Sequence, residues 1–142
     1  MERLKFYLLM FVLPAVVFGD GQSLDRSCLA NQAPAYDAQK NIELTALNRD
    51  MLVGNKFGLF SFVYPALPKN GYPIEFLEDG KIEAMQFGRS RWELIQGELH
   101  LTDDHGVLQV FTYDSRCKSL TSPVRLSDQT VLMELAIVRP PN

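Results

Sequence analysis

Histidine and cysteine, on which many catalytic and metal sites depend, are scarce in this chain of 142 residues. The chain has two of each, and a single tryptophan. Two cysteines and two histidines make a poor ligand set for zinc. No serine lies in a nucleophile elbow, and no glycine loop has the spacing that cradles a phosphate. We therefore expect no catalytic residues, no metal and no cofactor.

A strong excess of one charge is absent as well. The chain carries 14 Lys and Arg against 17 Asp and Glu, a formal net charge of −3, and the two signs are interspersed. Nucleic acids and anionic membrane surfaces are bound through a basic footprint. The composition therefore argues against both as partners.

A hydrophobic run long enough to span a membrane is also missing. The apolar run Phe6–Phe18 is shorter than the ~20 residues that a spanning helix needs. It follows a short charged start and ends at Gly19 before a polar segment, which is the anatomy of a secretory signal peptide. We predict cleavage after Gly19, with no membrane span in the mature protein, and a secreted or periplasmic location.

The two cysteines, Cys28 and Cys117, both follow the predicted signal peptide. In an oxidising compartment a lone pair of cysteines favours one disulfide. This bond would close a long loop and contribute about 4 kcal/mol by the chain-entropy model, less any strain in the native state. We therefore predict a structural disulfide between these two residues.

The most regular part of the sequence runs from residue 74 to residue 113 and consists of strand-like segments separated by short polar breaks. These breaks are Glu78-Asp79-Gly80, Gln96-Gly97 and Asp103-Asp104-His105-Gly106. Aspartate and glycine favour the backbone conformations that tight hairpin loops need. Successive hairpins form an antiparallel meander, which must curl or close to protect its edges.

Other segments add further strands. Phe57–Tyr64 is apolar on both faces and predicts a buried strand, with a close backbone approach at Gly58. A short strand around Val124–Leu126 and a final strand Val131–Val138 follow the hairpins. Residues 41–53 fit either a short helix or a strand that enters the barrel, and both remain open.

The strand count places the chain in one all-β class. We predict a small antiparallel up-and-down β-barrel, lipocalin-like, of about seven or eight strands. The predicted organisation is a signal peptide over residues 1–19, an extended N-terminal segment over residues 20–40, and the barrel domain over residues 41–142.

Alternation along the hairpins assigns the side chains to two faces of the sheet. Trp92 and Leu94 share one face with Leu99 and Leu101 of the next strand, and the opposite face is polar except for Ile95. Between residues 107 and 113 both faces carry apolar groups. The polar side chains that would serve an enzyme as acid and base are Glu75, Glu83, Glu93 and His100, and this role requires an inward face beside a cavity.

Binding residues are predicted among the aromatic and loop positions. Trp92 faces the core, so an anchor in the barrel interior is favoured over a ligand-stacking role, which stays open. The proline-rich loop from Pro65 to Tyr72 and the segment of residues 20–40 are the expected contact regions. The predicted binding residues are Tyr64, Leu67, Tyr72 and Trp92.

The segments DGKI, at residues 79–82, and RWELIQGELHLTDDHG, at residues 91–106, resemble small bacterial secreted barrels of the lipocalin-like type. They are similar in particular to the bacterial metalloprotease-inhibitor family, in which a Trp and a Leu precede a Gly turn and a Leu-x-Leu strand. The resemblance implies an eight-stranded periplasmic barrel with one disulfide, and an N-terminal trunk that enters a protease cleft. The chain departs from the family because Cys28 and Cys117 lie far apart, and no inhibitory residue can be matched.

Three hypotheses for function follow. The first is a secreted or periplasmic non-enzymatic binding protein, with an inhibitor or immunity-type role toward a partner protein as its specific form. The second is a barrel that binds a small apolar ligand or a glycan in envelope or polysaccharide processes, or an enzyme with acid and base residues in the barrel mouth. The third is a component of an envelope assembly.

Overall fold

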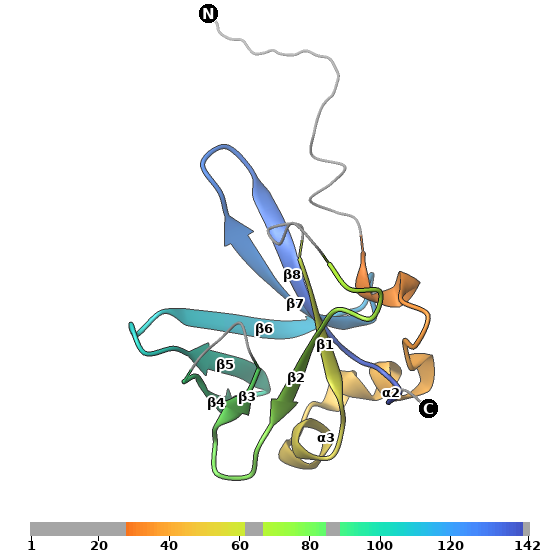
Figure 1. Ribbon diagram of the computed structural model, residues 1–142, viewed down its shortest axis with the longest axis horizontal. Helices are drawn as coiled ribbons and strands as arrows, with labels where there is room; N and C mark the ends of the chain where they lie inside the picture. The colour runs from red at the N-terminus through yellow and green to blue at the C-terminus, as the bar shows by residue number, and fades with distance from the viewer. Residues whose placement is uncertain (1–27, 62–66, 85–88, 141–142) are drawn as a thin grey trace, which may run out of the picture.

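The computed structural model describes residues 28–61, 67–84 and 89–140 (Figure 1). The predicted signal peptide, the first part of the N-terminal segment and Tyr64 lie outside these residues. Among the described residues no helix has the length and apolar character required to cross a bilayer.

In the part of the chain that the structure describes, four short helical elements accompany eight strands. The helical elements are η1 (Ala30–Gln32), α2 (Ala38–Ile42), η2 (Glu43–Ala46) and α3 (Arg49–Val53). The strands are β1 (Phe57–Ser61), β2 (Tyr72–Phe76), β3 (Ile82–Glu83), β4 (Arg91–Ile95), β5 (Glu98–Thr102), β6 (Leu108–Asp114), β7 (Ser119–Arg125) and β8 (Thr130–Ile137).

The strands form one antiparallel sheet in the order β3-β2-β1-β8-β7-β6-β5-β4. The two ends of this sheet meet, because Lys81 pairs with Arg91 in an isolated bridge. Beside the bridge, the backbone N–H of Trp92 donates to the carbonyl of Gly80 at 2.8 Å. Neighbouring strands around the sheet are consecutive in sequence except where the first strand, β1, pairs with the last, β8, which confirms the predicted small up-and-down barrel.

The predicted hairpin turns have the backbone conformations that their sequences require. Gly80, Gly97 and Gly106 all have positive φ, and Gln96 shares this conformation with Gly97 at the β4–β5 turn. Two consecutive left-handed residues match the right-handed twist of the flanking strands. The sequence rule for these three hairpins is therefore confirmed.

The barrel interior holds a single large hydrophobic core. The predicted inward faces are correct, since Trp92, Leu99 and Leu101 are buried in it. The largest fully buried members of the core are Phe57, Phe76, Phe111, Leu44, Leu52, Leu59, Ile74, Leu99, Leu120, Leu135 and Ile137. Two of these, Leu44 and Leu52, come from the helical segment, which packs against one end of the barrel (Figure 1).

Residues 41–53 are helical, so the helix alternative is the correct one. Asn48 caps α3 by accepting a hydrogen bond from the N–H of Met51 at 3.1 Å. The buried side chain of Asn41 holds α2 against the end of β8, because its amide both donates to and accepts from the backbone of Ile137. The helix caps and the buried amide of Asn41 stabilise these helices. Hydrophobic periodicity alone was compatible with both a helix and a strand.

The described part of the N-terminal segment is not simply extended, because it contains η1 and the start of α2. Residues 28–36, which we call the strap, lie on the outside of the barrel. Ala30 and Ala33 of the strap pack against Phe60 and Ala136, which are outward residues of β1 and β8. The predicted disulfide joins the strap to the β6–β7 turn, with Cys28 and Cys117 5.4 Å apart between their Cα atoms.

The C-terminal strands differ from prediction in their bounds. The last strand was expected at Val131–Val138 and is observed at Thr130–Ile137, a difference of one residue. The strand expected around Val124–Leu126 is longer and begins at Ser119. Ser119 and the two residues Thr121 and Ser122 are buried although polar, which is why hydrophobicity did not reveal this half of β7.

Candidate binding face

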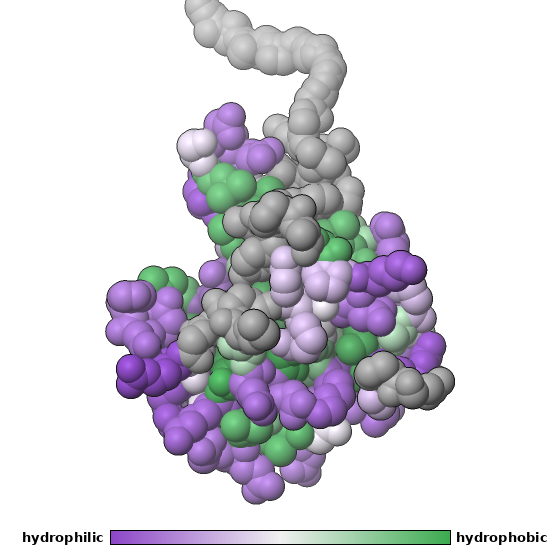
Figure 2. Space-filling view, in the orientation of Figure 1, coloured by the Kyte–Doolittle hydropathy of each residue, from purple (hydrophilic) through white to green (hydrophobic). Residues whose placement is uncertain are grey.

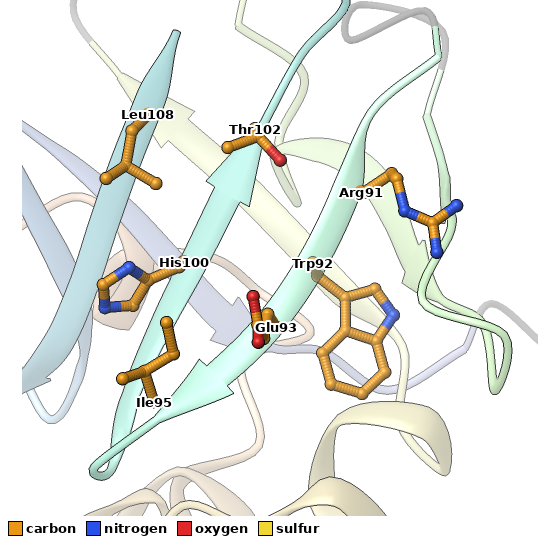
Figure 3. A pocket seen from close by; sticks show the side chains of 7 residues that line it. All are labelled: Arg91, Trp92, Glu93, Ile95, His100, Thr102 and Leu108. Atoms are coloured by element: carbon orange, nitrogen blue, oxygen red, sulfur yellow. The ribbon is translucent and has the colours of Figure 1, made fainter. Parts of the chain in front are cut away.

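The described surface has a depression of about 490 Å³ on the outside of β4, β5 and β6 (Figure 3). We call this surface the β4–β6 face. Its lining residues are Arg91, Trp92, Glu93, Ile95, His100, Thr102 and Leu108. The depression is formed by sheet residues, so its shape is set by the strand pairing.

Strand register brings these side chains together. Glu93 lies opposite His100, and Thr102 lies between Arg91 on one side and Leu108 on the other. Because alternate residues of a strand share a face, all five side chains project from the outer side of the barrel. Figure 3 shows Glu93, His100 and Leu108 on three neighbouring strands, with Arg91 directed away toward the β3–β4 seam.

Three large apolar side chains on or beside this face are exposed to solvent. Their exposed fractions are 39% for Ile95, 57% for Val107 and 51% for Leu108. Figure 2 shows a small hydrophobic group beside the tip of the β5–β6 hairpin, surrounded by hydrophilic residues. Ile95 and Leu108 line the depression from opposite ends of β5, with His100 and Thr102 between them. Exposed apolar side chains beside polar groups are typical of an interaction site.

Charged groups of both signs surround the apolar residues. The half-buried ring of His100 lies 3.2 Å from the carboxylate of Glu98, measured from Nε2 to Oε1. At the hairpin tip Arg89 lies 3.8 Å from Asp104, an exposed pair that stabilises the fold little. The face therefore has no dominant charge, and its recognition chemistry is apolar contact with a mixed polar rim.

The four residues considered as acid and base lie on the outside of the barrel. Glu93 and Glu83 are exposed, and Glu75 forms an ion pair with Lys56. His100 is outward as well and lines the depression. An enzyme in the barrel mouth would need these residues at inward positions beside a cavity, and none of the four has such a position.

The predicted binding residues that the structure describes are divided between two packing clusters. Tyr64 lies outside the described residues, and Leu67 packs against the strap cluster. Tyr72 packs against the barrel core from β2. Leu67 and Tyr72 are thus partly buried, and each contributes to packing in its own region.

The side chain of Trp92 is 6% exposed, and both its N–H group and its ring have partners inside the protein. Its indole N–H donates to the carbonyl of Leu77 at 2.9 Å, and its ring meets that of Phe76 edge to face. The guanidinium of Arg49 on α3 lies 5.1 Å from the ring centroid. These contacts fit the predicted anchor of the interior, and only the margin of Trp92 reaches the depression.

Sequence reasoning did not select the exposed apolar residues. The only signal for Ile95 was that it broke the polar alternation of its strand, and Leu108 and Val110 were visible only as apolar residues on both faces of one strand. An apolar residue that breaks the alternation of a strand shows which face of the sheet it lies on. It does not show whether that face is exposed, because exposure depends on what packs over the face. In β8 an equally irregular face is covered by the strap, whereas the β4–β6 face has no described segment over it.

Among the described residues, no three His, Cys, Asp or Glu side chains gather as a possible metal site. Comparison of the chain with protein-family models, with curated proteins and with solved structures finds no match. The resemblance to metalloprotease inhibitors therefore remains a prediction, and the geometry described above is the basis for assigning a function.

Proposed function

We propose that the protein is an exported, non-enzymatic binding protein that recognises a partner protein through the β4–β6 face. An inhibitor or immunity-type role is the specific form of this proposal. The observation that carries it is the group of exposed apolar side chains, Ile95, Val107 and Leu108, beside a depression with charges of both signs.

The position of the face, outside a barrel whose interior is filled, favours a protein over a small molecule. Sites for small ligands are concave and bury most of the ligand. The depression here lies on the convex outer side of a barrel, and large side chains such as Phe57, Phe76 and Phe111 occupy the interior. An outer sheet surface on which exposed apolar residues alternate with polar and charged groups has the mixed composition of a protein interface.

Export is supported by the disulfide. Disulfides persist in oxidising compartments and are rare in the cytosol of mesophiles. The Cys28–Cys117 bond joins residues 89 positions apart, and Cys117 is fully buried. Together with the predicted signal peptide, this bond favours the periplasm or the extracellular medium.

The proposal is tested by affinity capture with a matched pair of variants. The double variant Ile95→Asp, Leu108→Asp places charges at both ends of the depression, and Ile42→Asp changes an isoleucine on α2 that is at least as exposed as Ile95. The wild-type protein and the Ile42 variant are expected to recover the same partner from a periplasmic or secreted fraction. The double variant is expected to lose at least 90% of it, because desolvating an unpaired charge within an interface is unfavourable.

Two outcomes would contradict the proposal. One is equal recovery of the partner by all three proteins, provided that the double variant keeps the wild-type circular dichroism. The other is recovery of no protein by the wild type, together with a shift in melting temperature on adding a small apolar molecule or a glycan.

A further inference from the structure

A fully buried carboxylate lies on the outer side of the barrel, where polar residues normally face water. Glu134 of β8 is 0% exposed, and its side chain is covered by the strap. Buried carboxylates are retained only when their oxygens are hydrogen-bonded. The position of Glu134 therefore depends on the partners that the strap supplies.

The partners of Glu134 come from the two chain segments that carry the cysteines. Oε2 accepts from the N–H of Leu29 at 2.7 Å, and Oε1 accepts from the N–H of Ala30 at 3.2 Å. Oε1 also lies 3.4 Å from the hydroxyl of Ser119, which can donate to it. Leu29 directly follows Cys28, and Ser119 is two positions after Cys117. The side chain of Glu134 thus contacts both of the segments that carry the cysteines and aligns them with each other.

The strap is a separate unit from the main core. Its apolar residues form a small cluster with Phe60 and Ala136, and no strap residue belongs to the cluster that fills the barrel. Its other attachments are peripheral hydrogen bonds, including Tyr36 Oη to the carbonyl of Lys118 at 2.6 Å and Ala35 N–H to Asn70 Oδ1 at 3.0 Å. Loss of the strap would therefore uncover the outside of β1 and β8 without opening the interior.

We propose that Glu134 is the positioning residue of a thiol-controlled latch. Its carboxylate aligns the strap so that Cys28 meets Cys117, and reduction of this disulfide releases the strap from a barrel that stays folded. The coupling is reciprocal, because any interaction that favours the closed strap also favours the disulfide, and the disulfide in turn favours that interaction.

The chemistry of the latch is thiol–disulfide exchange. A thiolate such as that of glutathione attacks one sulfur of the Cys28–Cys117 bond and forms a mixed disulfide, and a second thiolate resolves it. The protein disulfide gains two electrons and two protons and becomes two thiols. Two glutathione thiols lose the same electrons and protons and become one glutathione disulfide.

The equilibrium between the protein and glutathione tests the role of Glu134. The purified protein is incubated in buffers with different ratios of reduced to oxidised glutathione, and the oxidised fraction is measured after trapping the thiols. Glu134→Ala is expected to shift the equilibrium toward the dithiol by ~10-fold or more, because both hydrogen bonds from the strap, those of the Leu29 and Ala30 N–H groups, are lost. Glu134→Gln keeps one oxygen acceptor and should give a smaller shift.

The matched control is Glu75→Gln, which neutralises an exposed carboxylate of β2. This variant should have the wild-type equilibrium. The proposal is overturned if Glu134→Ala and the wild-type protein have the same equilibrium with glutathione, or if Glu75→Gln shifts it as much as Glu134→Ala does.

A second measurement uses the unaltered protein and does not depend on a variant that folds. Amide hydrogen exchange is compared with and without dithiothreitol, which reduces the disulfide and itself becomes a cyclic disulfide. Exchange at Leu29 and Ala30 should become at least ~10-fold faster on reduction, while Leu99 and Leu135 in the barrel stay protected. Unchanged exchange in the strap would overturn the proposal, and so would loss of protection at all four amides.

Discussion

At the scale of single residues, the environment of Glu134 sets its protonation. Burial raises the pKa of this carboxyl above its ordinary value of 4.5, and the nearby carboxylate of Asp114 raises it further. Hydrogen bonds from Leu29, Ala30 and Ser119 act in the opposite direction and are outweighed. The phenol of Tyr36 also faces Glu134, but burial raises its pKa to about 12, so it remains neutral.

This pKa shift predicts how stability changes with pH. A carboxyl whose pKa is higher in the folded state contributes stability that is fully present below pH 4.5 and is lost as the pH rises through the raised value. Relative to Glu134→Gln, the wild-type protein should therefore become less stable as the pH increases from 4 toward neutrality. Urea unfolding of both oxidised proteins over this pH range measures the difference. A difference that stays constant, or that grows in favour of the wild type with pH, would show that burial does not dominate.

At the scale of elements, the hairpins were predictable because their turns are specified locally. Glycine at a positive φ and aspartate that hydrogen-bonds to its own turn depend on only a few neighbouring residues. The first half of β7 was not predictable, because its serines and threonine are buried by the strands and strap around them. The helices at residues 38–53 were partly predictable. Their caps depend on neighbouring residues, whereas the contact of Asn41 with β8 joins residues far apart in the sequence.

The β5–β6 turn gives a prediction at this scale. Asp103 Oδ1 accepts hydrogen bonds from the N–H groups of His105 and Val107, at 2.8 and 3.0 Å. Asp103→Ala should therefore lower the free energy of unfolding by about 1–2 kcal/mol and speed amide exchange in the turn. Asp104→Ala is the control, since this side chain pairs with Arg89 at an exposed position and should change stability by less than about 0.5 kcal/mol. Equal losses from both changes would contradict this account of the turn.

At the scale of the whole molecule, the sequence predicted the barrel and the disulfide but not the candidate binding face. The barrel follows from consecutive hairpins that must close, and the disulfide from two cysteines in an oxidising compartment. The face depends on which outer surfaces remain uncovered after the strap has packed on β1 and β8. That outcome rests on contacts between residues about 100 positions apart, which alternation along one strand does not encode.

The central claim is that the β4–β6 face binds a partner protein, and site-specific photocrosslinking in the producing cells tests it most directly. A photoreactive amino acid replaces Leu108 in one protein and Ile42 in another, since both side chains are about half exposed. We expect one discrete protein adduct from position 108 and none of that mass from position 42. The same adduct from both positions, or no adduct from position 108, would contradict the claim.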